Sequence, residues 1–339
     1  MLNDLYEVIE DLSDIPENWG KPYFSQDQYY EPVELSENNL HNFKAKRTGR
    51  KVCCIDGGNN KIFESPTDSV HLIRIYFNLF KGEKRVENIE PVTTFLISRF
   101  DGEKVRAELK IVDGSIPFSR TDFLLQGSEM EEKSPASAGH TVRKYLEWEV
   151  LQYAVNEYLE EDDIVIRDGV LQTTVESERE YAEEAYEKVE ENQVALVGIA
   201  KTSSLMTTKN YPLIASVQAI ARQTDKRMWY YHPVAKNDHP DHQGEMYIVK
   251  YHPSSNYAFR TEFYKNIDVD VKEVLGELAF QAKDPIFLGY PYGLVDADKR
   301  ARVTDEEIDY LKNMCDNRME ESFRDKINSC NAHDRLSSI

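Results

Sequence analysis

The 339-residue sequence predicts an α/β fold in which helices flank a mixed central sheet. Short apolar runs with strand character alternate along the chain with segments whose apolar residues recur at the helical period, which indicates interleaved strands and helices. Hydrophobic residues make up 40% of the chain, so a substantial core is expected. No apolar run reaches the roughly 18 residues of a membrane-spanning helix, and we expect none.

The first 120 residues predict an irregular segment followed by strands. Residues 1–50 are expected to be irregular and partly helical, and they end in the basic run "KAKRTGRK". Strands are expected at 51–56, where Gly57 and Gly58 follow as a turn, and at 69–80, whose mostly apolar residues suit a buried strand. Residues 91–115 read as a hairpin that turns at Asp101-Gly102.

The middle of the chain contains the clearest helix. A polar loop at about 120–140 is expected to be an insertion. The helix follows at 141–163, with Thr141 as its N-cap. Three further elements are predicted after it: a strand at 164–169, a surface helix at 176–192 and a buried strand at 194–204.

The last third is expected to contain β segments around a His-rich turn, "KNDHPDHQGE", and a helix at 270–283. Residues 320–339 read as a polar tail. We therefore expect three parts: an N-terminal segment at 1–50, one large domain at 51–319, and the tail at 320–339.

The net charge of −20 argues against a protein that simply coats nucleic acid, which would be basic. It does not exclude a nuclease, because a site that gathers carboxylates for metal ions adds negative charge. The four cysteines show no CxxC spacing and two of them lie on a probable core strand. We expect reduced thiols, a cytoplasmic location and no zinc site.

Two predicted strands end in the same way, in "CCIDGG" and "IVIRDG". Asp56 and Asp168 would converge if these strands are neighbours, since ligands gather at strand ends in α/β sheets. Carboxylates from adjacent strands with a third from a helix are what a divalent-metal nuclease needs. The alternative is that Asp-Gly is a simple turn, which is how we interpret Asp113.

Glu147 lies on the apolar stripe of the predicted helix, where a carboxylate is costly unless it is paired or binds a metal ion. A salt bridge to Arg143, four residues earlier, is the competing interpretation. Glu149 lies on the wetter face of the helix and is the less favoured ligand.

Two basic residues of the predicted strands could contact a phosphate, Lys201 and Arg260. Lys201 ends the strand "VALVGIA" and would steady negative charge beside the carboxylates, although lysine at a strand end is often only solvated. Arg260 shares one face of a strand with Glu262, and a surface ion pair is the simpler interpretation of the two. His239 and His242 have HxxH spacing, but a metal site there is not favoured.

Several stretches, in their order, resemble the NurA nuclease family of archaea and bacteria: "CIDGGNN", "RKYLEWEVLQYA", "IVIRDGVLQ", "VGIAKTS", "FRTEF" and "FLGYPYGLVDADKRA". They extend from about residue 51 to residue 303. The resemblance implies an RNase H-like core, a ring-shaped homodimer and a metal-dependent nuclease. Such enzymes degrade DNA ends, prefer Mn²⁺, with Mg²⁺ as the other candidate, and partner a HerA-type hexameric ATPase that acts as a translocase.

The same resemblance implies roles for individual residues. The metal ligands and catalytic residues would be Asp56, Glu147, Asp168 and Asp298, together with Lys201 and Tyr290, and the substrate-binding residues would be Arg260, Lys201 and Arg143. The family pattern has an Ala-His pair where this chain has Ala297-Asp298. Because a carboxylate differs from imidazole in charge and reach, an alternative function is a weakened subunit that mainly docks on the ATPase.

Overall fold

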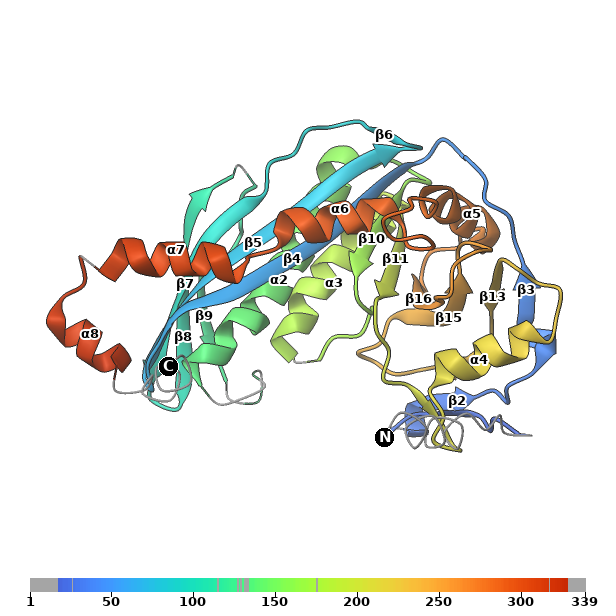
Figure 1. The fold of residues 1–339 in the computed structure, drawn as a ribbon, viewed down its shortest axis with the longest axis horizontal. Helices are drawn as coiled ribbons and strands as arrows, with labels where there is room; N and C mark the ends of the chain where they lie inside the picture. Colours follow the sequence, from blue (N-terminus) through green and yellow to red (C-terminus); the bar gives the residue numbers. More distant parts are fainter. Residues whose placement is uncertain are drawn as a thin grey trace, which may run out of the picture.

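One large mixed sheet organises the chain (Figure 1). The computed structural model describes residues 18–25, 27–114, 116–126, 128, 130, 134–174, 176–316 and 318–328. Residues 1–17 of the expected N-terminal segment and the end of the tail, 329–339, lie outside this set. None of the helices in the described ranges combines the length and the apolar character needed to cross a bilayer.

The centre of the sheet consists of five strands in the spatial order β7, β5, β4, β10, β11. They are β4 (Lys51–Glu64), β5 (Asp68–Lys81), β7 (Val92–Asp101), β10 (Ile164–Asp168) and β11 (Ala195–Ala200). The pairs β4–β5 and β5–β7 are antiparallel, whereas β10 runs parallel to both β4 and β11. This order and these directions are those of the RNase H-like fold, so the predicted core is confirmed.

Further strands extend the sheet on both sides. Beyond β7 lie β8 (Lys104–Asp113) and β9 (Asp122–Leu125), and β6 (Lys84–Arg85) pairs with β5. Beyond β11 lie β16 (Phe259–Tyr264), β15 (Gly244–Lys250), β13 (Trp229–Tyr231) and β3 (Leu40–Asn42). Two small pairs stand apart from this sheet: β1 (Pro22–Tyr23) with β12 (Met206–Thr207), and β2 (Tyr30–Pro32) with β14 (Ala235–Asn237).

Helices cover both faces of the sheet, which explains why the run from Val52 to Ile55 is apolar at every position. Cys53 and Ile55 pack against α2 (Ala138–Tyr158) and α3 (Glu176–Glu191) on one face. Val52 and Cys54 pack on the other face against two helices, α5 (Val271–Gln281) and α6 (Tyr292–Ala301). The remaining α-helices of the described residues are α4 (Leu213–Arg222), which packs on β13 and β15, and α7 (Asp305–Asp316) and α8 (Glu321–Asn328).

The expected turn after Asp56 is wrong. Strand β4 continues through the two glycines, which pair with Ile75 and Arg74 of β5, and it ends only at Glu64. A Cβ atom on Gly58 would lie 2.2 Å from the carbonyl oxygen of Ala301. The glycine is therefore required because the end of α6 packs directly on the strand, and no turn is involved.

Other element boundaries also differ from the predictions. The long helix begins at Ala138 and ends at Tyr158, so Thr141 is a buried residue inside it and does not cap it. The described part of residues 18–50 holds short strands and 3₁₀ turns where a partly helical segment was expected. Helix α4 was not predicted. The hairpin at Asp101-Gly102 and the strands at 69–80 and 164–169 are confirmed within one or two residues.

Candidate active site

Three carboxylates meet on the face of the sheet that α6 covers. Asp56 lies in the middle of β4, Asp168 ends the neighbouring strand β10, and Asp298 comes from α6. The parallel register pairs Arg167 with Ile55, and this places Asp168 beside Asp56. Each of the three aspartates offers an oxygen, and these oxygens all lie within 4.8 Å of one another. Since Mg²⁺ and Ca²⁺ hold oxygen ligands at about 2.0–2.6 Å, this spacing suits one shared divalent cation.

Lys201, the residue after β11, points its ammonium group into this cluster. Its Nζ atom lies 2.6 Å from Oδ2 of Asp168, 2.8 Å from Oδ1 of Asp298 and 3.6 Å from Oδ2 of Asp56. The ammonium of Lys201 thus contacts all three carboxylates. Arg302, four residues after Asp298 on the chain, donates to Oδ2 of that aspartate at 3.0 Å.

The crowding of charge alters the acidity of these groups. Burial, followed by the carboxylates of Asp168 and Glu147, raises the pKa of Asp56 from 3.8 to about 7. Burial alone would lower the pKa of Lys201, but Asp168 and Asp56 raise it. The pKa of Asp298 is lowered, because its bonds to Lys201 and Arg302 outweigh its partial burial. Asp56 is therefore the carboxylate whose charged form is destabilised most by burial and by its neighbours.

The raised pKa of Asp56 predicts a pH-dependent cost in stability. The folded protein binds this proton more tightly than the unfolded chain does, so stability is lost as the pH rises from about 4 to about 7. Asp56→Asn removes that cost. With EDTA present, the melting temperature of the variant should exceed that of the wild type by at least about 2 °C at pH 8. The difference should shrink toward zero near pH 4. A difference of equal size at both pH values would contradict this assignment.

Tyr290 adds a hydroxyl to the cluster. It is 2% exposed, and its hydroxyl donates to Oδ1 of Asp168 over a long 3.5 Å. Burial, with Asp168 and Asp56, raises the pKa of this hydroxyl, so it stays protonated and acts as a donor. The residue precedes Pro291, which caps α6, so the same short segment positions both Tyr290 and Asp298.

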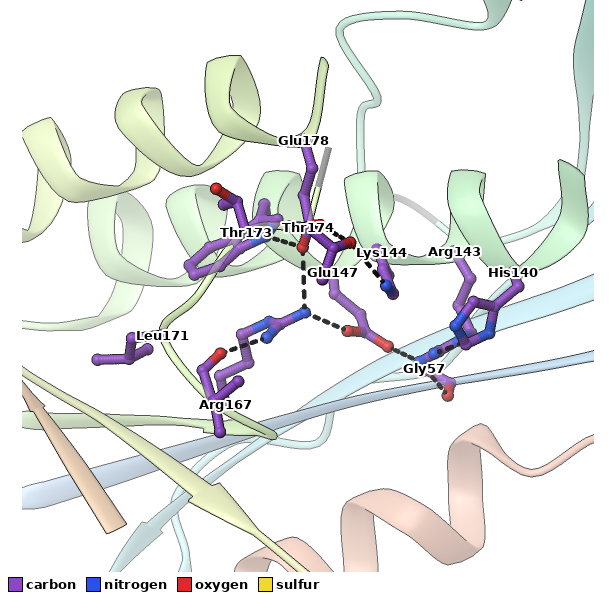
Figure 2. A network of polar contacts seen from close by, with 12 residues as sticks. Gly57, His140, Arg143, Lys144, Glu147, Arg167, Leu171, Thr173, Thr174 and Glu178 are labelled. Atoms are coloured by element: carbon purple, nitrogen blue, oxygen red, sulfur yellow. Dashed lines mark hydrogen bonds and ion pairs between the residues drawn. The ribbon is translucent and has the colours of Figure 1, made fainter. Parts of the chain in front are cut away.

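Glu147 lies on the opposite face of the sheet, and its oxygens are not part of the three-carboxylate group (Figure 2). Its carboxylate accepts from Arg143 and, at 3.2 Å, from Nη2 of Arg167. Burial still raises its pKa, despite these two arginines. The salt bridge to Arg143, which was the competing interpretation of the sequence, is therefore present. Glu149 lies elsewhere, and its carboxylate accepts from the backbone and the hydroxyl of Ser119.

The two arginines predicted to bind substrate are also engaged. Besides Glu147, Arg143 donates to the carbonyl of Gly57 at 3.1 Å, so it holds the backbone next to Asp56. Nε of Arg260 lies 2.6 Å from Oε1 of Glu262, which is fully buried, so this pair is not the surface pair that the sequence suggested. Burial alone would raise the pKa of Glu262, but Arg260 and His242 lower this pKa to about 2. Nε2 of His242 lies 3.0 Å from Oε2 of Glu262, so this histidine belongs to a buried polar network.

Sequence reasoning missed two arginines of this region. Arg302 was detectable, because its spacing of four residues from Asp298 on a helix is the spacing of an ion pair. Arg167 was not, because it occupies a position within an apolar strand and its partner Glu147 is 20 residues away.

Comparisons with known proteins agree with the predicted resemblance. A family model described as the NurA domain matches residues 50–303. Among solved structures, the chain is similar to the NurA nuclease from Sulfolobus solfataricus, with 12% identity, a TM-score of 0.49, and coverage of 94% of this chain and 95% of that one. It is also similar to endonuclease V of Ciona intestinalis bound to a 24-mer DNA containing an inosine, with 12% identity, a TM-score of 0.39 and coverage of 80% and 92%. A search of curated proteins found no match.

Proposed function

Because the chain belongs to the NurA family, we propose that it is a DNA nuclease that hydrolyses phosphodiester bonds with one or two divalent cations held by Asp56, Asp168 and Asp298. The observation that carries this proposal is the meeting of the three carboxylates, with oxygens within 4.8 Å of one another, beside Lys201. Carboxylates that are far apart in the sequence rarely gather, because like charges at this spacing repel one another unless a cation balances them.

The donor set fits a hard cation. All three side chains offer oxygen ligands, which suit Mn²⁺ or Mg²⁺ better than a soft metal. The raised pKa of Asp56 supports the same conclusion, because a group of carboxylates that repel one another is relieved when a dication binds. A bound divalent ion would supply charge stabilisation for the phosphate and an activated water.

The other polar groups of the site would bind the phosphate or position the carboxylates. The ammonium of Lys201 lies at the carboxylates and is placed to neutralise a phosphate oxygen that approaches them. The hydroxyl of Tyr290 orients the carboxylate of Asp168. Arg143 holds the carbonyl of Gly57 and so fixes the strand at Asp56. Glu147 remains a predicted ligand, and the variant Glu147→Gln tests that role.

The finer features of the family are part of this proposal. The enzyme would act on DNA ends as a homodimer in the cytoplasm. It would receive DNA from a HerA-type ATPase, since this sequence contains no P-loop "GxxxxGK[ST]" of its own.

The experiment is to incubate the purified protein with end-labelled linear DNA, with Mn²⁺, Mg²⁺ or EDTA, in the presence and absence of the cognate translocase. We expect cleavage with Mn²⁺ or Mg²⁺ and none with EDTA. Cleavage that persists in EDTA would contradict the metal assignment. Absence of cleavage under every condition, together with a stable complex with the ATPase, would favour the docking function instead.

A further inference from the structure

The loop that follows Asp168 is held closely against the sheet. The chain turns at Gly169, whose φ is 117°, and residues 169–174 lead from β10 toward α3. Asp168 pairs with Ile199, and the amide of Gly169 donates to the carbonyl of Ile199 at 2.9 Å. The loop then lies flat on β11, because a Cβ atom on Gly198 would lie 2.7 Å from the carbonyl oxygen of Gly169. The position of this loop therefore affects the end of the strand that presents Asp168.

A fully buried carboxylate, that of Glu262 in β16, anchors the loop. Its Oε2 accepts from the amide of Leu171 at 2.7 Å, and Nε2 of His242 lies 3.0 Å from the same oxygen. Its Oε1 accepts from Nε of Arg260 at 2.6 Å and lies 2.5 Å from Nη2 of that guanidinium. Both oxygens thus face donors, and an ionised carboxylate is the side chain that offers two acceptors and no donor.

The buried ring of His242 is held at both of its nitrogens. Its Nδ1 lies 3.0 Å from the hydroxyl of Tyr30 in β2. Because Glu262 is an acceptor at Nε2, the proton of a neutral ring belongs on Nε2, and Nδ1 then accepts from the tyrosine. A series of contacts therefore runs from the N-terminal segment through His242 and Glu262 to Leu171, three residues after Asp168.

The His-rich turn also holds the loop through its backbone. The amide of Gln243 donates to the carbonyl of Leu171 at 3.0 Å, and the amide of Thr173 donates to the carbonyl of Asp241 at 2.9 Å. Turn and loop thus run side by side as a short antiparallel pair, with His242 in its middle. The function of the His-rich turn that follows from these contacts is to support the loop after Asp168.

This network lies on the face of the sheet opposite to the three carboxylates. In the register of β11 and β16, Gly198 pairs with Glu262, whereas its neighbour Ile199 pairs with Thr261 and lies beside Asp168. Glu262 therefore acts on Asp168 through the backbone. Loss of an outer partner of a metal ligand typically costs about 10- to 100-fold in metal affinity or activity, and a misplacement of about 1 Å can cost about 100-fold in rate.

We propose that Glu262 is a positioning residue for the proposed metal site: with His242 it anchors Leu171 and so fixes the end of β10 from which Asp168 reaches a divalent cation. This inference rests on the proposed nuclease function and adds a residue that contacts neither the ion nor the substrate.

The test compares Glu262→Gln with the wild type. Glutamine has the same size, but its amide group must face either Arg260 or the pair of Leu171 and His242, all of which are donors. Binding of Mn²⁺ without DNA, measured by electron paramagnetic resonance of the free ion, should weaken about 10- to 100-fold. The kcat for cleavage of linear DNA should fall by a similar factor, while KM for DNA stays unchanged. Hydrogen exchange at the amide of Leu171 should become faster.

Glu277→Ala is the matched control. Glu277 of α5 is also fully buried and also anchors a loop, since it accepts from the amide and the hydroxyl of Thr48 at 2.5 and 2.8 Å. That loop enters β4 at Lys51, five residues or about 17 Å before Asp56. The control should lower the melting temperature and leave Mn²⁺ affinity and kcat unchanged. Equal losses of Mn²⁺ affinity in Glu262→Gln and Glu277→Ala would overturn the positioning role, because any loss of stability would then produce them.

Two substitutions of His242 test the same contact and carry the test if Glu262→Gln does not fold. The amide of glutamine reaches the position of Nε2, and that of asparagine reaches the position of Nδ1. His242→Gln can therefore keep the contact with Glu262, and His242→Asn can keep only the contact with Tyr30. His242→Asn should lose more Mn²⁺ affinity than His242→Gln. An equal or reversed ranking would overturn the part assigned to Nε2.

The remaining outcomes separate this inference from the proposed function. If the wild type neither binds Mn²⁺ nor cleaves DNA, the proposed function fails and this inference fails with it. If the wild type does both and Glu262→Gln equals it, only the inference fails. Faster exchange at Leu171 with unchanged Mn²⁺ affinity and kcat would also overturn it, because the loop would then move without displacing Asp168. A rise in KM alone would overturn it as well and would assign the network to holding Arg260 against the substrate.

Discussion

Asp56→Asn is expected to reduce the rate of DNA cleavage by at least about 10³-fold. Asp56 is 8% exposed and shares the carboxylate cluster with Asp168 and Asp298. Loss of one ligand charge removes several kcal/mol of electrostatic stabilisation of the phosphate, and each 1.36 kcal/mol is a factor of ten in rate. Asparagine keeps the shape of the side chain, so the fold should be unaffected. The measurement is the initial rate of cleavage of linear DNA in Mn²⁺, with folding checked by the melting temperature.

The chain offers a matched control for this experiment in Asp113. Like Asp56, this residue is followed by a glycine, but it ends β8, three strands away from β4 in the sheet. Asp113→Asn should cleave at the rate of the wild type. Retention of more than about a tenth of the activity in Asp56→Asn would show that the cation is held without Asp56, and the assignment of the cluster would then be wrong.

Three of the four Asp-Gly pairs, those at Asp56, Asp113 and Asp168, show how far the sequence leads. Asp113 and Asp168 both end strands, as the pattern predicts, and each is followed by a glycine with positive φ. Asp56 has the same local sequence, but its strand continues for eight more residues. The difference comes from α6, which packs on Gly58 and needs the absence of a side chain there. The sequence around Asp56 therefore does not indicate that Gly58 packs against Ala301.

The same limit applies to the faces of the sheet. The alternation of side chains in strands shows that Asp168 and Arg167 point to opposite faces, and the sequence contains this information. Which helix covers each face is decided by packing across the whole domain. Glu147 was therefore correctly identified as a buried carboxylate that needs a partner. Its second partner, Arg167, could not be predicted, because the contact depends on where α2 crosses β10 in the folded domain.

Glu147→Ala is expected to destabilise the protein by about 3 kcal/mol, because it leaves Arg167 buried with much of its charge uncompensated. The side chain of Arg167 is 7% exposed. It would retain the carbonyl of Val170, the more distant Glu178 at 3.9 Å and the ring of Trp148, so the loss falls at the lower end of the range for a broken buried pair. The measurement is the free energy of unfolding from denaturant titration.

The control on the same helix is Glu149→Ala. The partners of Glu149 are the neutral amide and hydroxyl of Ser119, so its removal should cost only about 1–2 kcal/mol. A larger loss for Glu149 than for Glu147 would contradict the ion-pair account.

Glu147→Gln separates the structural role of Glu147 from the predicted metal-ligand role. Glutamine keeps an acceptor for Arg143 and Arg167 but has no charge, so the protein should remain folded with a smaller loss of stability than in Glu147→Ala. If the carboxylate serves only the two arginines, cleavage by folded Glu147→Gln should stay within about threefold of the wild type, since Asp56, Asp168 and Asp298 are intact. If the side chain instead turns toward the ion when substrate binds, the folded variant should lose activity by more than about 100-fold and require more Mn²⁺ for half-maximal cleavage. A loss of cleavage rate much larger than the loss of stability would therefore show that Glu147 acts on the metal ion. A loss of stability with little loss of rate would show that it only pairs with the two arginines.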